Sequence, residues 1–164
     1  MQIAPSRLER YGTVYLRLAL AAGFLTAVAD RFGLWGPPGA TNVAWGDFGH
    51  FLAYTATLNP YLPAAWIPPL GWVVTVAEVG LGGALLIGVR TREAAFAAGV
   101  LLLLFALGMT VGTGVKSALN ASVFSASGGA FLLAHARQYA WSVDALRRAD
   151  RDTAFARARP RSSP

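Results

Sequence analysis

A long apolar run from Gly71 to Arg92, GWVVTVAEVGLGGALLIGVRTR, most constrains what this chain can fold into. It is rich in glycine, it ends in two arginines, and it matches the about 20 residues that a helix needs to cross a bilayer. A single carboxylate, Glu78, lies near its middle. Ionising an acid in hydrocarbon costs a few kcal/mol or more, so acids at such depth are rare and usually functional. The run therefore predicts a membrane helix with a buried ionisable group.

The composition of the whole chain is that of an integral membrane protein. The 164 residues are 55% hydrophobic and only 13% charged, whereas soluble domains are about 25% charged. The net charge is +6, but the arginines lie at the ends of apolar runs and in the tail, which argues against nucleic-acid binding. The absence of cysteine excludes thiol exchange and thiolate ligation within this chain, and two histidines argue against a haem or multi-histidine metal site.

The apolar segments predict an all-α, integral membrane four-helix bundle with a short interfacial or re-entrant helix in its first loop. Spans are expected at about 12–32, 70–89, 94–111 and 116–136, and the short helix at about 45–58. Residues 1–136 then form one four-span domain, and residues 137–164 form a basic tail.

The first apolar run also has features of a signal peptide. Basic residues precede it, and Ala27-Val28-Ala29 resembles a small-residue cleavage site. Arg17 lies inside the apolar core, which is unusual for a signal peptide, and no long soluble domain follows. We therefore expect a retained first span.

The distribution of positive charge predicts the topology. The amino end, the turn at Arg90 and the tail are basic, whereas no lysine or arginine lies between Gly33 and Val89. Cytoplasmic loops of membrane proteins carry an excess of lysine and arginine. Both termini are therefore expected in the cytoplasm, in a multi-pass protein of a bacterial-type plasma membrane.

Two stripes of small residues suggest how the first two spans pack. The residues at i, i+4 and i+8 are Ala19, Gly23 and Ala27 in the first span, and Gly80, Ala84 and Gly88 in the second. Small residues let membrane helices approach closely, so we expect the two stripes to meet. The alternative is that glycine and alanine are simply abundant here.

Glu78 is the first candidate for a functional residue, and Arg17 of the first span is its candidate partner. They form either a proton-linked or ligand-binding pair inside the bundle, or a buried ion pair that fixes the helix register. Glu78 shares a helical face with Gly71, Thr75 and Gly82.

A second polar group is expected at the outer membrane surface. Its members are Asp30, Arg31, Asp47, His50, Lys116 and Asn120. They form either a pocket covered by the short loop helix or the ordinary charge found at helix ends. Asp47 and His50 are too few for a metal site. Nearby aromatic residues, among them Trp45 and Phe51, line a quinone or lipid-headgroup site or form an interfacial belt.

Two stretches resemble the DoxX-like family of small four-helix membrane proteins, which includes the small subunit of thiosulfate:quinone oxidoreductase. The stretches are RLALAAGFLTAVADRF, with its early arginine, and AEVGLGGALLIGVRTREAA, with its central glutamate and closing turn. The similarity covers about residues 17–134. Arg17 and Glu78 match the charged positions of the family's pattern, and Gly82 and Gly88 match its glycines. Arg31 stands where the family often has a lysine, and the short loop helix and basic tail depart from the pattern.

The resemblance implies an accessory subunit of a membrane redox system that binds a quinone, a lipid-like ligand or a partner protein. The cofactor is unknown: a quinone fits, and the sequence has no haem, flavin or metal motif. No catalytic constellation is present, so an enzyme is not expected from this chain alone. Besides the lipid bilayer, the expected partners are a redox protein or further copies of the chain. A small proton-linked transporter and a purely structural or assembly protein remain as alternatives.

Overall fold

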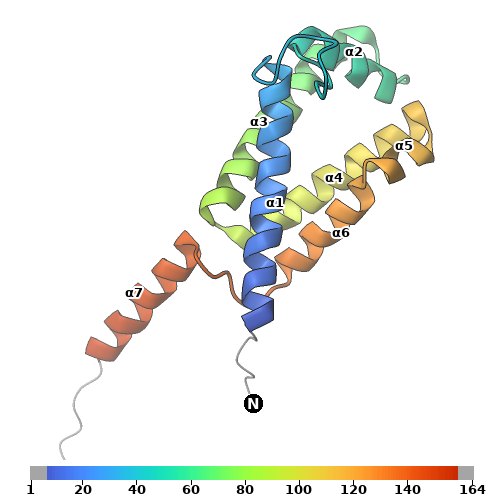
Figure 1. Cartoon of the computed structure of the whole chain (residues 1–164). Helices are drawn as coiled ribbons and strands as arrows, with labels where there is room; N and C mark the ends of the chain where they lie inside the picture. The colour runs from blue at the N-terminus through green and yellow to red at the C-terminus, as the bar shows by residue number, and fades with distance from the viewer. Residues whose placement is uncertain (1–6, 159–164) are drawn as a thin grey trace, which may run out of the picture.

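The computed structural model describes the backbone of residues 7–158 and the side chains of residues 7–150, and within that range it is all-helical (Figure 1). In chain order the elements are α1 (Arg7–Arg31), α2 (Phe48–Leu58), η1 (Ala64–Trp66), α3 (Ile67–Ile87), α4 (Thr91–Thr113), α5 (Val115–Asn120), α6 (Val123–Ala134) and α7 (Val143–Ala158). The predicted all-α class is confirmed for the described residues.

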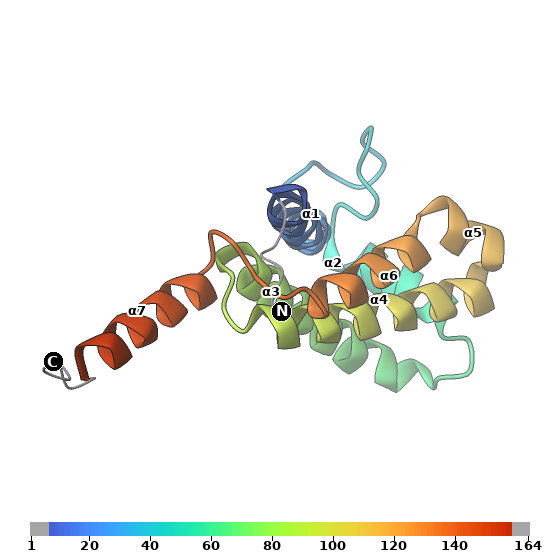
Figure 2. The ribbon, with the colours of Figure 1, turned by 90° about the horizontal axis from the view of Figure 1, so that it is seen from below.

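Two helix pairs form the body of the molecule. Helix α1 packs along α3, and α4 packs along α6. The pairs lie together where α1 begins and diverge toward α2 and α5, and Figure 2 shows α7 extending away from both (Figures 1 and 2). The core between the pairs consists mainly of Leu20, Ala21, Phe24, Leu85, Ala95, Ala98, Ala130 and Leu133. Its many alanines let the backbones approach closely.

Three helical segments are long and apolar enough to cross a membrane: Arg7–Arg31, Ala64–Ile87 and Thr91–Thr113. They correspond to the first three predicted spans. Prolines occupy the first turn of α3, where a missing N–H is tolerated, and Gly88 ends the helix in the left-handed conformation, φ 71°. A turn of only three residues then leads into α4, so α3 and α4 are antiparallel neighbours.

The predicted fourth span, 116–136, is wrong as a continuous helix. The structure breaks this segment into α5 and α6, with Ser122 at φ 55°. Helix α6 has 12 residues, about 18 Å, which is shorter than the about 30 Å hydrocarbon core. Asn120 and Ser122 flank the break, and such side chains compete for backbone hydrogen bonds. The four-helix bundle is therefore not confirmed.

The short loop helix is present as α2, within the predicted 45–58. The carboxylate of Asp47 begins it by accepting a hydrogen bond from the backbone N–H of His50 at 2.8 Å. The other end of α2 touches α4 so closely that a Cβ at Gly112 would overlap the Thr57 carbonyl oxygen. Helix α2 therefore connects the two diverging pairs.

The two small-residue stripes do not meet as predicted. A Cβ added to Gly23 or Gly80 would contact nothing within 4 Å. The close approach of α1 and α3 runs instead through Gly82, whose added Cβ would lie 3.0 Å from Leu25 and 3.3 Å from Phe24. The stripe of α1 faces a cavity, because Ala19, Gly23 and Ala27 all line it.

Candidate functional site

A buried ion pair joins the end of α1 to the middle of α3. Arg31 Nη1 pairs with Glu78 Oε2, and the two side chains are 2% and 3% exposed. The same Nη1 also donates to the Thr75 hydroxyl at 3.0 Å, which in turn donates to the Gly71 carbonyl at 2.7 Å. The pair is therefore held by hydrogen bonds within one face of α3. That face is the predicted one, since Gly71, Thr75, Glu78 and Gly82 are all buried.

Aromatic side chains cover the arginine of this pair. The Cζ atom of Arg31 lies 3.8 Å from the centre of the Phe51 ring and 5.3 Å from the Trp45 ring. Both distances fall within the about 6 Å reach of a cation–π interaction. The carboxylate of Asp30 holds the loop in place by accepting a hydrogen bond from the backbone N–H of Trp45 at 2.8 Å. Residues from α2 and its preceding loop thus form a lid over the ion pair.

Three polar atoms of this cluster are buried without a hydrogen-bond partner among the described residues. They are Arg31 Nε, Asp30 Oδ1 and Glu78 Oε2, of which the last is ion-paired with Arg31. Most buried polar atoms are satisfied by protein or water, and of these residues Arg31 and Glu78 line the cleft described next, so their unsatisfied atoms lie on residues that a bound group could reach.

A large cleft lies beside the ion pair, between the two helix pairs. Its volume is about 960 Å³, at the upper end of the about 300–1,000 Å³ typical of small-molecule sites. It follows α1 from Leu16 to Arg31, a rise of about 22 Å. Leucine-rich α4 forms the opposite wall, and α2 forms the end wall.

Polar groups of the cleft are concentrated at the α2 end. They are Arg31, Tyr54, Thr55, Asn59, Tyr61 and Glu78. The remaining lining is overwhelmingly aliphatic and aromatic. Such a site suits a molecule with an apolar chain and a hydrogen-bonding head group. In the part of the chain that the structure describes, no three His, Asp or Glu side chains gather to hold a metal ion.

Arg17 is not the partner of Glu78. Its guanidinium donates to the Trp141 carbonyl at 2.7 Å and to the Ala140 carbonyl at 3.4 Å. These acceptors follow α6 at the opposite end of the molecule from α2. Arg31, which the sequence places in the outer polar group, supplies the positive charge beside Glu78 instead.

The other predicted members of the outer group do not join the ion pair. Asp47 and His50 form their own exposed pair, Nδ1 to Oδ2 at 2.9 Å. The backbone and side-chain hydrogen bonds from His50 lower the pKa of Asp47. Lys116 and Asn120 lie exposed on α5, and no hydrogen bond or ion pair links them to the other described members.

Sequence reasoning missed the polar residues that α2 contributes to the cleft. Tyr54, Thr55 and Asn59 belong to no motif. The available signal was the helical spacing of Phe51 and Thr55, the two buried residues of α2. That spacing predicts one buried face, and the polar residues beside it line the cleft.

A second polar cluster fixes the start of α7 to the α3–α4 turn. Asp144 accepts hydrogen bonds from the Arg90 N–H at 3.0 Å, the Thr91 N–H at 2.7 Å and the Thr91 hydroxyl at 2.8 Å. Burial raises the pKa of Asp144, but these hydrogen bonds outweigh burial and lower it overall. In return, the Asp144 N–H donates to the Gly88 carbonyl at 3.0 Å. The first part of the predicted tail is therefore packed against the body.

Comparison with known proteins identifies the family. No curated protein and no solved structure matches the chain. One family model matches residues 9–124, more than two thirds of the 164 residues, and it describes the methylamine utilisation protein MauE. The resemblance to the DoxX-like family is therefore wrong, because its loose glycine and charge pattern did not separate that family from this one. The chain is a membrane protein that belongs to the MauE family.

Proposed function

We propose that this chain is an accessory membrane protein of a methylamine utilisation system, and that it holds a long-chain amphiphile in its cleft. The family description supports the first part. The cleft of about 960 Å³, with a buried ion pair in its wall, supports the second and carries the proposal. A quinone or a membrane lipid is the ligand class, because both combine a polar head with an apolar chain.

The cleft is polar at one end and apolar along the rest, and this difference orients the proposed ligand. Its apolar part extends about 22 Å along α1, enough for a long chain. Its polar end offers the hydroxyl of Tyr54, the amide of Asn59 and the Arg31–Glu78 pair. The head group is therefore placed under α2, and the chain lies between the two helix pairs.

The chain's own residues bind and orient the ligand. The fixed charges of Arg31 and Glu78 sit in a dry wall, where electrostatic interactions are stronger than in water. Because the sequence has no cysteine, thiol exchange is not part of the chemistry of this chain. A redox role would therefore rest on the ligand or on a partner protein.

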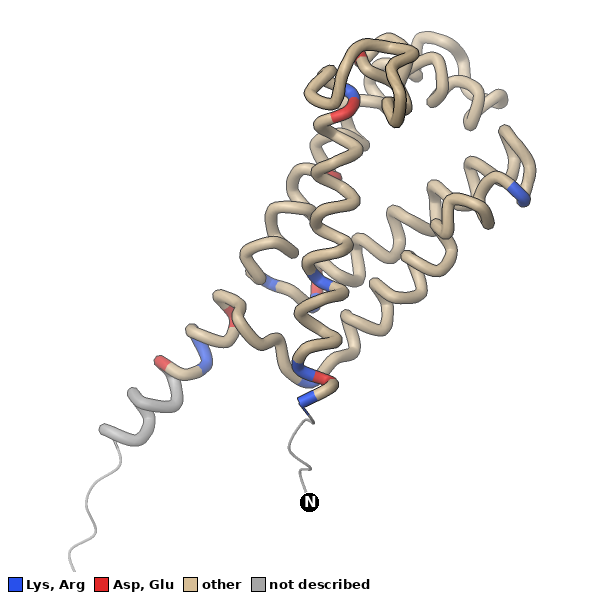
Figure 3. The backbone as a smooth tube through the Cα atoms, in the orientation of Figure 1, with Lys and Arg blue, Asp and Glu red and all other residues tan. Residues whose placement is uncertain are grey.

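The distribution of arginine supports an orientation with both termini in the cytoplasm of a bacterial-type plasma membrane. Figure 3 shows lysine and arginine gathered mainly where α1 and α7 begin. Cytoplasmic segments are enriched in these residues. The α2 end of the cleft then faces the outer side, so a ligand enters from the outer half of the bilayer.

A quinone titration tests the ligand part of the proposal. Purified protein is titrated with a short-chain quinone while quenching of tryptophan fluorescence is followed, because Trp45 lines the cleft. We expect saturable binding that Glu78→Gln weakens by at least about fivefold, since it leaves Arg31 without its counter-charge. A long-chain phospholipid added as competitor separates the two ligand classes. No saturable binding, or the same affinity for both proteins, would contradict quinone binding.

A further inference from the structure

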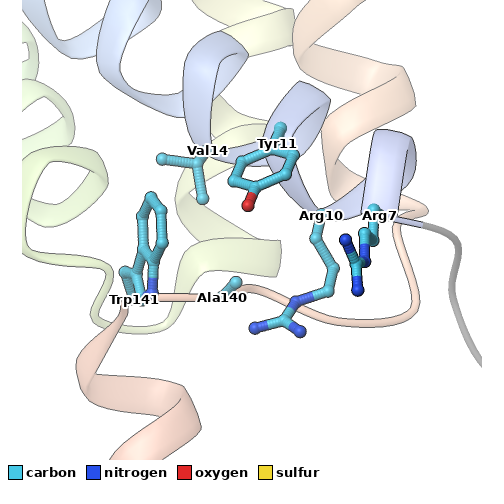
Figure 4. A pocket seen from close by; sticks show the side chains of 6 residues that line it. All are labelled: Arg7, Arg10, Tyr11, Val14, Ala140 and Trp141. Atoms are coloured by element: carbon cyan, nitrogen blue, oxygen red, sulfur yellow. The ribbon is translucent and has the colours of Figure 1, made fainter.

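A second, small pocket lies far from α2, where α1 begins and the chain approaches α7 (Figure 4). Its volume is about 90 Å³. The lining residues are Arg7, Arg10, Tyr11, Val14, Ala140 and Trp141. A pocket of this size accepts a phosphate-sized group and is far smaller than the about 300 Å³ that drug-sized ligands need.

Two arginines give this pocket its charge. Arg7 and Arg10 are three residues apart on α1, so they lie on the same face. Neither forms an ion pair with a described residue. Glu9, the acidic residue of the first turn, does not line the pocket. Figure 4 shows both guanidinium groups on the same side of the pocket, below the Tyr11 ring. Each planar guanidinium can donate two parallel hydrogen bonds to a phosphate.

The backbone of Trp141 is strained in a way that shapes the pocket. Its φ is 50°, a conformation that costs energy for a bulky residue. The side chain is 68% exposed, so burial of the ring does not offset this cost. The conformation instead places the ring edge-on to Tyr11, with the centroids 6.0 Å apart, and points the carbonyl at Arg17. Strain of this kind is a feature of binding sites.

We propose that this pocket binds the phosphate of an anionic lipid head group. Arg7 and Arg10 neutralise the phosphate, and the Tyr11 hydroxyl can donate to it. A lipid is the source because α1 enters the bilayer here, and because tyrosine and tryptophan favour the head-group level of membranes. This pocket shares no lining residue with the cleft, so lipid binding here does not depend on whether the cleft binds its proposed ligand.

Native mass spectrometry of the full chain tests the proposal. The protein is released from bilayers of phosphatidylcholine mixed with phosphatidylglycerol, and the retained lipids are counted. We expect wild type to retain phosphatidylglycerol, and Arg7→Gln/Arg10→Gln to retain it at least about fivefold less, since the double variant removes the charge-assisted hydrogen bonds that both arginines donate to the phosphate. The control Arg147→Gln changes an exposed arginine outside the pocket and should retain it as wild type does.

A second variant separates binding from folding. Trp141→Gly suits the positive φ, so we expect an unchanged or higher melting temperature together with lower retention of phosphatidylglycerol. Equal retention by wild type and the double arginine variant would overturn the proposal. Displacement of the lipid by low millimolar inorganic phosphate would assign the pocket to soluble phosphate and would overturn the lipid assignment.

Discussion

Arg31 at the end of α1 and Glu78 in the middle of α3 form an ion pair whose side chains are 2% and 3% exposed. The pair joins the first two spans at the depth where α2 closes the cleft. It is also the only described ion pair between two different helices. The pair therefore connects the packing of α1 on α3 with the charge in the cleft wall.

Removing one member of this pair should be more harmful than removing both. Glu78→Leu leaves Arg31 buried without a counter-charge, and such losses cost about 3–5 kcal/mol. Arg31→Met should cost a similar amount, whereas the double variant should be more stable than either single one. Thermal unfolding in detergent measures all four proteins as a double-mutant cycle. Additive losses would show that the two charges are not coupled.

The Asp144 cluster should make stability depend on pH at the acidic end. The hydrogen bonds from Arg90 and Thr91 lower the folded pKa of this carboxyl. The stability that the Asp144 carboxylate contributes is therefore fully present above its unfolded pKa of about 3.9. This stability is lost as the pH falls through the lower pKa of the folded state. Asp144→Ala should cost about 0.5–2 kcal/mol near neutral pH, as the loss of a helix cap does.

The pH dependence of stability tests whether the ionised form of Asp144 is the one that stabilises the fold. Thermal unfolding of wild type and of Asp144→Ala is measured from pH 6 down to the lowest pH at which both proteins fold. The difference between them should shrink as the carboxyl of wild type is protonated. A difference that stays constant over this range would contradict the role assigned to the ionised carboxylate.

Gly112 should be needed to keep α2 attached to α4. A Cβ at this position would overlap the backbone of Thr57, which cannot move away as a flexible side chain could. Gly112→Ala should therefore loosen α2 and raise its hydrogen exchange. The matched control is Gly80→Ala, which meets nothing within 4 Å and should be neutral or stabilising by up to about 1 kcal/mol. Equal hydrogen exchange of α2 in both variants would show that Gly112 is not needed for the contact between α2 and α4.

The parts of the fold that are set by local pattern could be predicted from the sequence. Three apolar runs give α1, α3 and α4, and the buried face of α3 follows from the helical spacing around Glu78. The partner of Glu78 could not be predicted, because the first predicted span holds two arginines, Arg17 and Arg31. Arg17 donates its hydrogen bonds to carbonyl groups more than 120 residues later in the chain, and no local sequence pattern indicates such a contact.

The break in the last apolar segment has a different cause. Asn120 and Ser122 suit hydrogen bonds between membrane helices as well as they suit a helix break. Hydropathy alone does not separate these alternatives, so the segment was expected to be one span. A pocket under the short loop helix was one of two predicted alternatives, but the extent of the cleft along α1 could not be predicted, because it arises from how two helix pairs diverge rather than from any motif.

The presence of a ligand in the cleft is tested most directly by mass spectrometry of molecules extracted from the purified protein. Gly23→Leu fills the cleft without a clash, since an added Cβ meets nothing within 4 Å, and Gly80→Leu makes the same change outside the cleft. We predict that wild type and Gly80→Leu carry the same stoichiometric long-chain amphiphile, and that Gly23→Leu loses most of it. The same extracted molecules from all three proteins, or none from wild type, would contradict the account.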